Sequence, residues 1–330
     1  MSRIFRTLIV AGILSIVMTG TALGEEVIIG HYGDPAPVQV AIANGKFEEA
    51  TGWNIEWRKF DSGAQVIAAM ASGDVQISEL GSSPLAIATS QGLDLNLALI
   101  SFVIGKSEAL VTRESAGISE PSDLIGKRIA VPIGSTSHLA LMGALEHWGI
   151  DASEVRIIGM QPNQIYAAWT QDAIDAAFVW YPVQGKLLEN GKRLVTAGKV
   201  ATWGYPTFNG WVVSSDFASE NAAEMVAFIE TMNAVNERYR NSKESWTAES
   251  APVRKIADRT GASAEQVPAI LDGNQYLTAQ EQVSEAWLGG GAAKALKTTA
   301  EFLESVGRIN TATDDYNTFV DASFAEEAAR

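Results

Sequence analysis

Short apolar runs rich in β-branched residues alternate along this chain with longer stretches whose apolar residues recur at helical spacing. The run Arg128–Val131, for example, is followed by the helical pattern of Ser137–Trp148, and the next apolar run is Val155–Ile158. Alternation of strand and helix patterns is typical of βαβ units. It predicts an α/β fold with mixed sheets, and no repeat of about 20–50 residues indicates a solenoid or a propeller.

The predicted elements form two units of the same type. In the first unit we expect strands at residues 27–30, 55–60, 75–78, 95–102 and 109–112, and helices at 38–49, 64–71 and 84–91. In the second unit we expect strands at 128–131, 155–158, 176–180 and 193–195, and helices at 137–148, 164–170 and 182–189. A strand at 208–213 is followed by helical patterns, beginning with 218–239, which predict a helical cover and no third sheet.

This order of elements predicts two α/β lobes, the first of which is discontinuous in sequence. Lobe one is expected to comprise residues 25–110 and 205–330, and lobe two residues 111–204. The chain then crosses twice between the lobes, and the two crossings form a natural hinge. Closure of such a hinge around a ligand is a standard motion of binding proteins.

The N-terminal residues have the pattern of a cleavable secretion signal. Arg3 and Arg6 form a short basic segment, Leu8–Met18 is an apolar run, and Ala22 and Gly24 have the small-residue spacing that signal peptidases accept. The apolar run is shorter than the roughly 20 residues that a membrane-spanning helix needs. We therefore expect residues 1–24 to be a signal peptide, the mature protein to be periplasmic, and no part of it to insert in the membrane.

Composition excludes several classes of site and partner. The chain has no cysteine and three histidines, so disulfides and cysteine-based zinc sites are excluded and no metal site is expected. Its formal net charge of −15 disfavours nucleic acid and anionic membrane surfaces as partners. An anionic ligand must therefore be held by local hydrogen-bond donors, because the overall field repels it.

Two strand–turn–helix junctions carry such donors. The first contains Gly81, Ser82 and Ser83 before Pro84, with Ser83 expected as the N-cap and Pro84 as the first helical residue. The second contains four further candidates: Ser135, Thr136, Ser137 and His138. Each junction presents unpaired backbone N–H groups, hydroxyls and the positive end of a helix dipole, which together make an anion site. One junction falls in each predicted lobe, although ordinary helix capping also explains these residues.

A set of segments is spread over the whole mature chain: Phe60–Ala64, Ala71–Ile77, Gly81–Pro84, Ser107–Val111, Asp123–Pro132, Ser135–His138, His147–Ile150, Ala167–Trp169, Val179–Trp180 with Pro182, Trp203–Gly204, Pro206–Thr207, Trp211–Val213 and Asn274–Thr278. In this order the segments resemble the periplasmic taurine-binding proteins of ABC importers, within the sulfonate, nitrate and taurine solute-binding family.

The resemblance implies a type II periplasmic binding fold, with two α/β lobes around a central ligand cleft. It implies a solute-binding role without catalysis or cofactor, with delivery of taurine or a closely related small alkanesulfonate to a transmembrane permease and its cytoplasmic ATPase. We expect the protein to act as a monomer.

The chain departs from the family where the ammonium group of taurine needs a carboxylate. The resemblance implies acidic residues at two positions that hold Ala36 and Asn209 here. Asp34, two residues from the first position, is the expected substitute, and Trp180 offers an aromatic face for the cation. The sulfonate end is thus better supported than the amine end.

Two further residues and two other functions complete the predictions. Glu108 is expected to make interlobe hydrogen bonds at the hinge, and His138 either contacts the ligand or packs in the protein. A hydrolase that uses His138 with Ser135 or Ser137 is an alternative, but no Gly-x-Ser-x-Gly motif accompanies these residues. The same fold could instead bind nitrate, a pyrimidine precursor or another sulfonate, which the volume of the cleft would distinguish.

Overall fold

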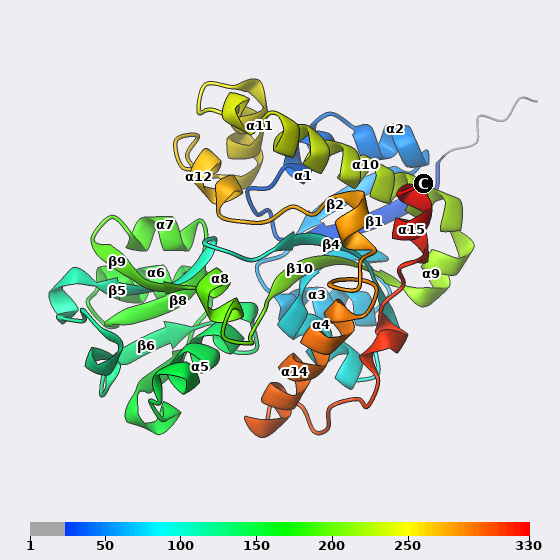
Figure 1. Ribbon diagram of the computed structural model, residues 1–330. Helices are drawn as coiled ribbons and strands as arrows, with labels where there is room; N and C mark the ends of the chain where they lie inside the picture. Colours follow the sequence, from blue (N-terminus) through cyan, green and yellow to red (C-terminus); the bar gives the residue numbers. More distant parts are fainter. Residues whose placement is uncertain (1–23) are drawn as a thin grey trace, which may run out of the picture.

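The computed structural model describes residues 24–330, and its strands form two five-stranded mixed sheets, each covered by helices (Figure 1). The predicted signal peptide, apart from Gly24, lies outside the described residues. In residues 24–330 no helix is both long and apolar enough to cross a membrane.

The first sheet has the strand order β2-β1-β3-β10-β4. Strands β2, β1 and β3 are parallel, and β10 is antiparallel to both β3 and β4. The strands are β1 (Glu26–His31), β2 (Asn54–Lys59), β3 (Ile77–Gly81), β4 (Leu95–Val103) and β10 (Phe208–Ser214). The strand that enters last in the sequence therefore lies between two early strands and ties the returning chain to the first lobe.

The second sheet has the order β7-β6-β8-β5-β9. Its strands are β5 (Glu108–Arg113), β6 (Arg128–Val131), β7 (Arg156–Gly159), β8 (Ala176–Trp180) and β9 (Gly191–Thr196). Strand β5 is antiparallel to β8 and to β9. Residues 108–110 therefore belong to the second sheet, whereas we had predicted them in lobe one. An apolar run predicts a strand but does not show which sheet pairs with it.

The helices follow the predicted pattern, with two breaks. The helices before the return of the chain are α1 (Val38–Ala43), α2 (Lys46–Thr51), α3 (Gly63–Ala71), α4 (Ser82–Ser90), α5 (Thr136–Trp148), α6 (Pro162–Thr170), α7 (Val183–Leu187) and α8 (Ala197–Ala201). The predicted helix 38–49 is two helices, because Gly45 takes a left-handed conformation with φ of 62° that interrupts the helical hydrogen bonds.

The C-terminal helices cover the first lobe, as predicted. They are α9 (Ser215–Glu220), α10 (Ala222–Asn241), α11 (Ala251–Thr260), α12 (Val267–Asp272), α13 (Ala279–Gln282), α14 (Gly291–Ser305) and α15 (Ser323–Ala328). Helix α14 packs on α4, α10 on α2 and α15, and α11 on α1 (Figure 1). The predicted helix 218–239 is divided at Asn221, between α9 and α10.

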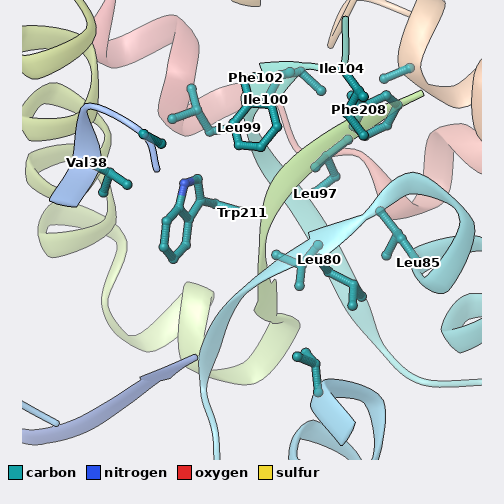
Figure 2. Close-up of a cluster of buried hydrophobic side chains, with 14 of the residues drawn as sticks. Val38, Leu80, Leu85, Leu97, Leu99, Ile100, Phe102, Ile104, Phe208 and Trp211 are labelled. Atoms are coloured by element: carbon teal, nitrogen blue, oxygen red, sulfur yellow. The ribbon is translucent and has the colours of Figure 1, made fainter. Parts of the chain in front are cut away.

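The core of the first lobe is built on β4 and β10 (Figure 2). Leu97, Leu99 and Ile100 of β4 and Phe208 and Trp211 of β10 are almost completely buried. Each large apolar side chain removed from water contributes roughly 1.5–3 kcal/mol. This packing gives a rigid platform for the start of α4 and for the loop after β1.

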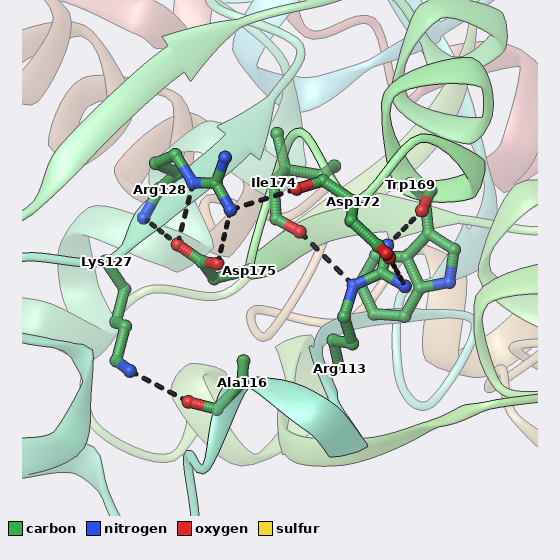
Figure 3. A network of polar contacts seen from close by, with 8 residues as sticks. All are labelled: Arg113, Ala116, Lys127, Arg128, Trp169, Asp172, Ile174 and Asp175. Atoms are coloured by element: carbon green, nitrogen blue, oxygen red, sulfur yellow. Dashed lines mark hydrogen bonds and ion pairs between the residues drawn. The ribbon is translucent and has the colours of Figure 1, made fainter.

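A polar network stabilises the edge of the second lobe (Figure 3). Arg128 donates to Asp175 from Nε at 3.0 Å and from a terminal nitrogen at 2.7 Å, and its backbone N–H donates to the same carboxylate at 2.8 Å. The buried Arg113 pairs with Asp172 at 2.6 Å and stacks over the Trp169 ring. The network joins β6 to the turn that precedes β8, so it fixes the strand that ends at the site.

Candidate functional site

A small cavity lies between the two lobes and is lined by residues of both. The volume open to the centres of water molecules is about 50 Å³. One water needs roughly 10–15 Å³ of such volume, so the cavity admits a few waters or a small organic molecule. The lining residues are Tyr32, Asp34, Pro35, Ser62, Gly63, Gly81, Pro84, Phe102, Ser107, Glu108, Ser135, Thr136, Trp180, Tyr181, Asn209, Ile270 and Asn274. No Lys or Arg stands among these described lining residues.

The first junction reaches the cavity through Gly81. Helix α4 begins at Ser82 with Gly81 as its N-cap, so the expected N-cap Ser83 and first residue Pro84 are each two positions too late. The extended backbone of Gly81 continues β3 directly into the helix, and no separate turn precedes it. The first N–H groups of α4 have no partner within the helix and remain available as donors.

The second junction faces the first across the cavity. Ser135 is the N-cap of α5, and its hydroxyl accepts from the His138 N–H at 3.2 Å. A methyl group placed on Gly81 would lie 3.2 Å from Cγ2 of Thr136. The N-terminal ends of α4 and α5 therefore meet at one point, from opposite lobes.

The Glu108 carboxyl group accepts hydrogen bonds from two hydroxyls of the second junction. Thr136 Oγ1 donates to Glu108 Oε1 at 2.6 Å, and Ser137 Oγ donates to Oε2 at 2.9 Å. All three residues lie in the second lobe, because β5 belongs to its sheet. The predicted interlobe hydrogen bonds of Glu108 are therefore intralobe, and these two hydroxyls orient a carboxyl group at the cavity wall.

A second carboxyl lies on the opposite wall, in the loop after β1. Asp34 Oδ2 accepts from Asn209 Nδ2 at 3.2 Å, and both side chains line the cavity. Behind them, Glu79 of β3 accepts from Ser101 Oγ at 3.0 Å and is 1% exposed. The cavity is thus bordered by acidic groups from both lobes.

Burial raises the pKa of all three carboxyl groups. Loss of hydration raises the pKa of Glu108 to about 7, against the opposing hydrogen bonds from Thr136 and Ser137. The pKa values of Asp34 and Glu79 are also raised, chiefly by burial, and the charge of Asp34 raises that of Glu79 further. A cation placed among these groups would favour their ionised forms.

Comparison with known proteins identifies the family. A family model described as NMT1/THI5 like matches residues 33–239, more than half of the chain. This chain belongs to the NMT1/THI5-like family. It is also 40% identical over 305 residues to the taurine-binding periplasmic protein of Escherichia coli K12, covering 92% of this chain and 94% of that relative. The resemblance predicted from the sequence segments is confirmed.

Solved structures of the same fold include sulfonate-binding proteins. The alkanesulfonate-binding protein SsuA of Xanthomonas axonopodis pv. citri, bound to MOPS, matches with a TM-score of 0.74 and 19% identity, over 92% of this chain and 100% of that one. This likeness confirms the predicted type II periplasmic binding fold. The desulfurization enzyme DSZB also shares it, with a TM-score of 0.66, 16% identity, and coverage of 92% and 98%. The fold alone therefore does not separate binding from catalysis.

The structure brings seven of the predicted site residues together. Asp34, Gly81, Glu108, Ser135, Thr136, Trp180 and Asn209 all line the cavity. Ser82 and Ser83 are fully buried beside it, and the Ser83 hydroxyl has no partner among the described residues. Ala36, where the resemblance implies an acidic residue, is a buried core residue.

His138 lies away from the cavity that its neighbours line. Its ring packs edge-on against Phe302 of α14, with centroids 5.6 Å apart, and Nδ1 accepts from the Gly134 N–H at 3.4 Å. Burial lowers its pKa to about 4, so the imidazole is neutral. Of the two predicted roles, packing is the one observed. Within the described residues, the Ser135 hydroxyl donates to the Pro132 carbonyl and the Ser137 hydroxyl donates to Glu108. Neither hydroxyl donates to the imidazole, so no nucleophile–base pair is formed there.

Sequence reasoning missed Glu79, Ser107 and Asn274. A glutamate within the fully buried strand β3 is a recognisable signal, because a charged group rarely lies in an apolar run without a function or a partner. Ser107 and Asn274 lie in segments that carry the family resemblance, but only the fold shows that their side chains meet. Among residues 24–330, no group of three or more His, Asp or Glu side chains is arranged to hold a metal ion.

Proposed function

We propose that this protein is the periplasmic solute-binding component of an ABC importer, and that it captures taurine or a closely related small alkanesulfonate. The observation that supports this most is the cavity at which two helix N-termini from opposite lobes meet two carboxyl groups. This arrangement offers donors to an anion and acceptors to a cation within one small volume, which suits a zwitterion.

The anionic end binds at the two helix starts. Unpaired N–H groups at the first turns of α4 and α5 point toward their N-terminal ends, and each helix dipole adds roughly 0.3–1 kcal/mol for a negative group. Hydrogen bonds to a charged group contribute about 1.5–3 kcal/mol each. Several of them hold a sulfonate without any Lys or Arg, which fits a chain with a formal net charge of −15.

The ammonium end binds between Asp34 and Glu108. Asp34 comes from the first lobe and Glu108 from the second, and both line the cavity. Their position compensates for Ala36 and Asn209, which carry no charge at the family's acidic positions. Trp180 and Tyr181 at the end of β8 supply the aromatic surface beside them.

The size of the cavity favours a small ligand. A volume of about 50 Å³ for the centres of waters suits a two-carbon sulfonate better than an aromatic one. Nitrate or a pyrimidine precursor would leave the carboxyl groups without a cation. Enzymatic turnover is not part of the proposal, because neither His138 nor a cysteine provides a base or nucleophile at the cavity.

The proposal includes export and delivery. The sequence pattern of residues 1–24 is that of a secretion signal, and periplasmic relatives such as the 40% identical protein support the same location. Closure of the two lobes around the ligand would present one shape to the permease when the protein is loaded and another when it is empty. A monomer suffices for this role.

A thermal-shift panel tests the proposal directly. We expect taurine, isethionate and short alkanesulfonates to raise the melting temperature of the mature protein, because a ligand at about 100 times its Kd stabilises the folded state by about 2.7 kcal/mol. Sulfate, nitrate and an aromatic sulfonate serve as the comparison set. Stabilisation by nitrate alone, or by none of the sulfonates, would contradict the proposal, and so would chemical conversion of bound taurine detected by mass spectrometry.

A further inference from the structure

The loop after α12 runs alongside the first connection between the two lobes, which leads from β4 to β5 (Figure 1). Gln275 forms an isolated antiparallel bridge with Val103, through N–H donors at 2.9 and 3.0 Å. Three residues further along the connection, the Lys106 N–H donates to the Gly273 carbonyl at 2.6 Å. We call residues 273–275 the hinge strap, because they hold the connecting segment on one side.

The connecting segment is also held on its other side. The Ile104 N–H donates to the Thr207 carbonyl on the return connection at 3.0 Å, and the Gly198 N–H of α8 donates to the Gly105 carbonyl at 3.0 Å. A methyl group on Gly105 would lie 2.2 Å from the Gly273 carbonyl oxygen. The strap and the two connections therefore form one tightly packed backbone layer at the hinge.

Asn274 links this layer to the ligand cavity. Its Oδ1 accepts from the Ser107 hydroxyl and from the Gly105 N–H, the latter at 3.5 Å. Only the oxygen of a carboxamide accepts from a backbone N–H, so this contact identifies which end of the amide faces the hinge. Ser107 and Asn274 both line the cavity. Ser107 is itself held by Gln184 of α7, whose Nε2 donates to its carbonyl at 3.2 Å.

The opposite end of the carboxamide is poorly satisfied. Asn274 is only partly buried, and within residues 24–330 its Nδ2 donates no well-formed hydrogen bond, although the Tyr276 hydroxyl lies near the amide. A donor in this position, at the wall of a cavity, gains most from an acceptor inside the cavity.

We infer that Asn274 is a ligand-binding residue that couples occupancy of the cavity to the hinge. Its Nδ2 donates to the anionic group of the bound solute, while Oδ1 holds Gly105 and Ser107 in place. The ligand thereby fixes the amide, and the amide fixes the connecting segment in the closed arrangement. This role rests on the proposed function, because it requires an anion in the cavity.

Three variants separate ligand contact from structural support. Asn274→Asp keeps an oxygen for Gly105 and Ser107 but replaces the NH₂ donor by an acceptor. Asn274→Ala removes both ends, and Ser107→Ala removes one hinge hydrogen bond and leaves Nδ2 in place. Each variant is compared with wild type for its melting temperature without ligand, its Kd for taurine and isethionate by calorimetry, and its compaction on ligand binding by small-angle X-ray scattering.

At about pH 8 we expect Asn274→Asp to weaken the binding of both sulfonates by at least about tenfold, as loss of one charge-assisted hydrogen bond predicts. Its unliganded melting temperature should stay close to wild type, whereas Ser107→Ala should lower that temperature and lose less affinity than Asn274→Asp. Wild-type affinity in Asn274→Asp would overturn the inference, and so would equal losses of affinity in Asn274→Asp and Ser107→Ala. If wild type bound neither sulfonate, the proposed function would fail and the inference with it.

Discussion

At the scale of single residues, the site is defined by carboxyl groups whose proximity cannot be recognised from the neighbouring sequence. Asp34 and Glu108 lie far apart in the chain and in different lobes, yet both line one small cavity. Each is held by neutral donors: Asp34 by Asn209, and Glu108 by Thr136 and Ser137. Burial raises the pKa values of both carboxyl groups, although the charge of Lys59 opposes this at Asp34. In the proposed function, the ammonium group of the ligand pairs with both of them.

Replacing Asp34 by asparagine tests the amine half of the function. Asp34→Asn retains an oxygen for Asn209 but removes the negative charge, so taurine should bind about 10–100 times more weakly. Isethionate has a hydroxyl in place of the amine and should lose less than about threefold. Calorimetric titration of the two ligands makes the comparison, and equal losses would remove Asp34 from ammonium recognition.

The same carboxyl groups predict opposite effects of pH on stability and on taurine binding. Their pKa values are raised in the folded state, so between about pH 5 and pH 8 the folded protein binds more protons than the unfolded chain. The free energy of unfolding of the empty protein should therefore fall as pH rises through this window. Taurine needs ionised carboxylates and should bind more tightly at about pH 8 than at about pH 5.

Melting curves and titrations at several pH values check both trends. Glu79→Gln provides a control, because Glu79 is buried behind the cavity and does not line it. The variant should flatten the dependence of stability on pH while taurine affinity changes little. A melting temperature that rises from about pH 5 to pH 8 in the wild type would contradict the assignment of raised pKa values.

At the scale of elements, the position of the aromatic wall of the cavity depends on the contacts that hold strand β8. Trp180 ends β8 at the cavity, and β8 begins directly after Asp175 in the polar network of the second lobe. The network accordingly supports the position of the aromatic wall without touching the ligand. Its effect should appear in stability and not in affinity.

Asp175→Ala should lower the free energy of unfolding by about 1–3 kcal/mol, because it removes the acceptor of the Arg128 backbone N–H and leaves the guanidinium only its hydrogen bond to the Asp172 carbonyl. Urea denaturation measures the change. The matched control is Asp258→Ala, which alters an exposed acid with no side-chain hydrogen bond among the described residues and should change stability by less than about 0.5 kcal/mol. Taurine Kd should stay within about twofold for both, and a tenfold loss for Asp175→Ala would show that the network acts on the site.

At the scale of the whole molecule, the closely packed hinge layer controls how the lobes meet. Gly105 has no space for a side chain, since an added methyl would lie 2.2 Å from a backbone oxygen of the strap. At Gly198 the corresponding distance to Gly105 Cα is 3.0 Å, so a methyl there is less disruptive.

We therefore expect Gly105→Ala to destabilise the protein by about 1–3 kcal/mol, the usual cost of overpacking, and to weaken taurine binding although it lies outside the cavity. Gly198→Ala should show both effects to a smaller degree. Melting temperature, Kd and scattering profiles with and without ligand give the comparison. Equal behaviour of Gly105→Ala and wild type would show that the strap does not constrain the hinge.

The local sequence pattern was sufficient to predict most of the helices and strands and to recognise the family. The strands Arg128–Val131 and Ala176–Trp180 have their predicted bounds, and the alternation of strands and helices predicted the fold class. These features depend on side-chain periodicity within a few residues, which is written in the sequence itself. The segments that carry the family resemblance are likewise local, and their order along the chain is enough to recognise it.

Contacts between distant segments were decided only by the tertiary structure. Sheet membership of Glu108, the meeting of Gly81 with Thr136, and the hydrogen bonds of Asn274 to the hinge each join residues that local pattern cannot pair. Burial determined the environment of the titratable groups, because the sequence does not show whether an aspartate or a histidine is surrounded by water or by protein. The sequence by itself determined the fold, the family and the two junctions, whereas packing determined which carboxyl groups face the ligand, since desolvation and partners depend on the whole fold.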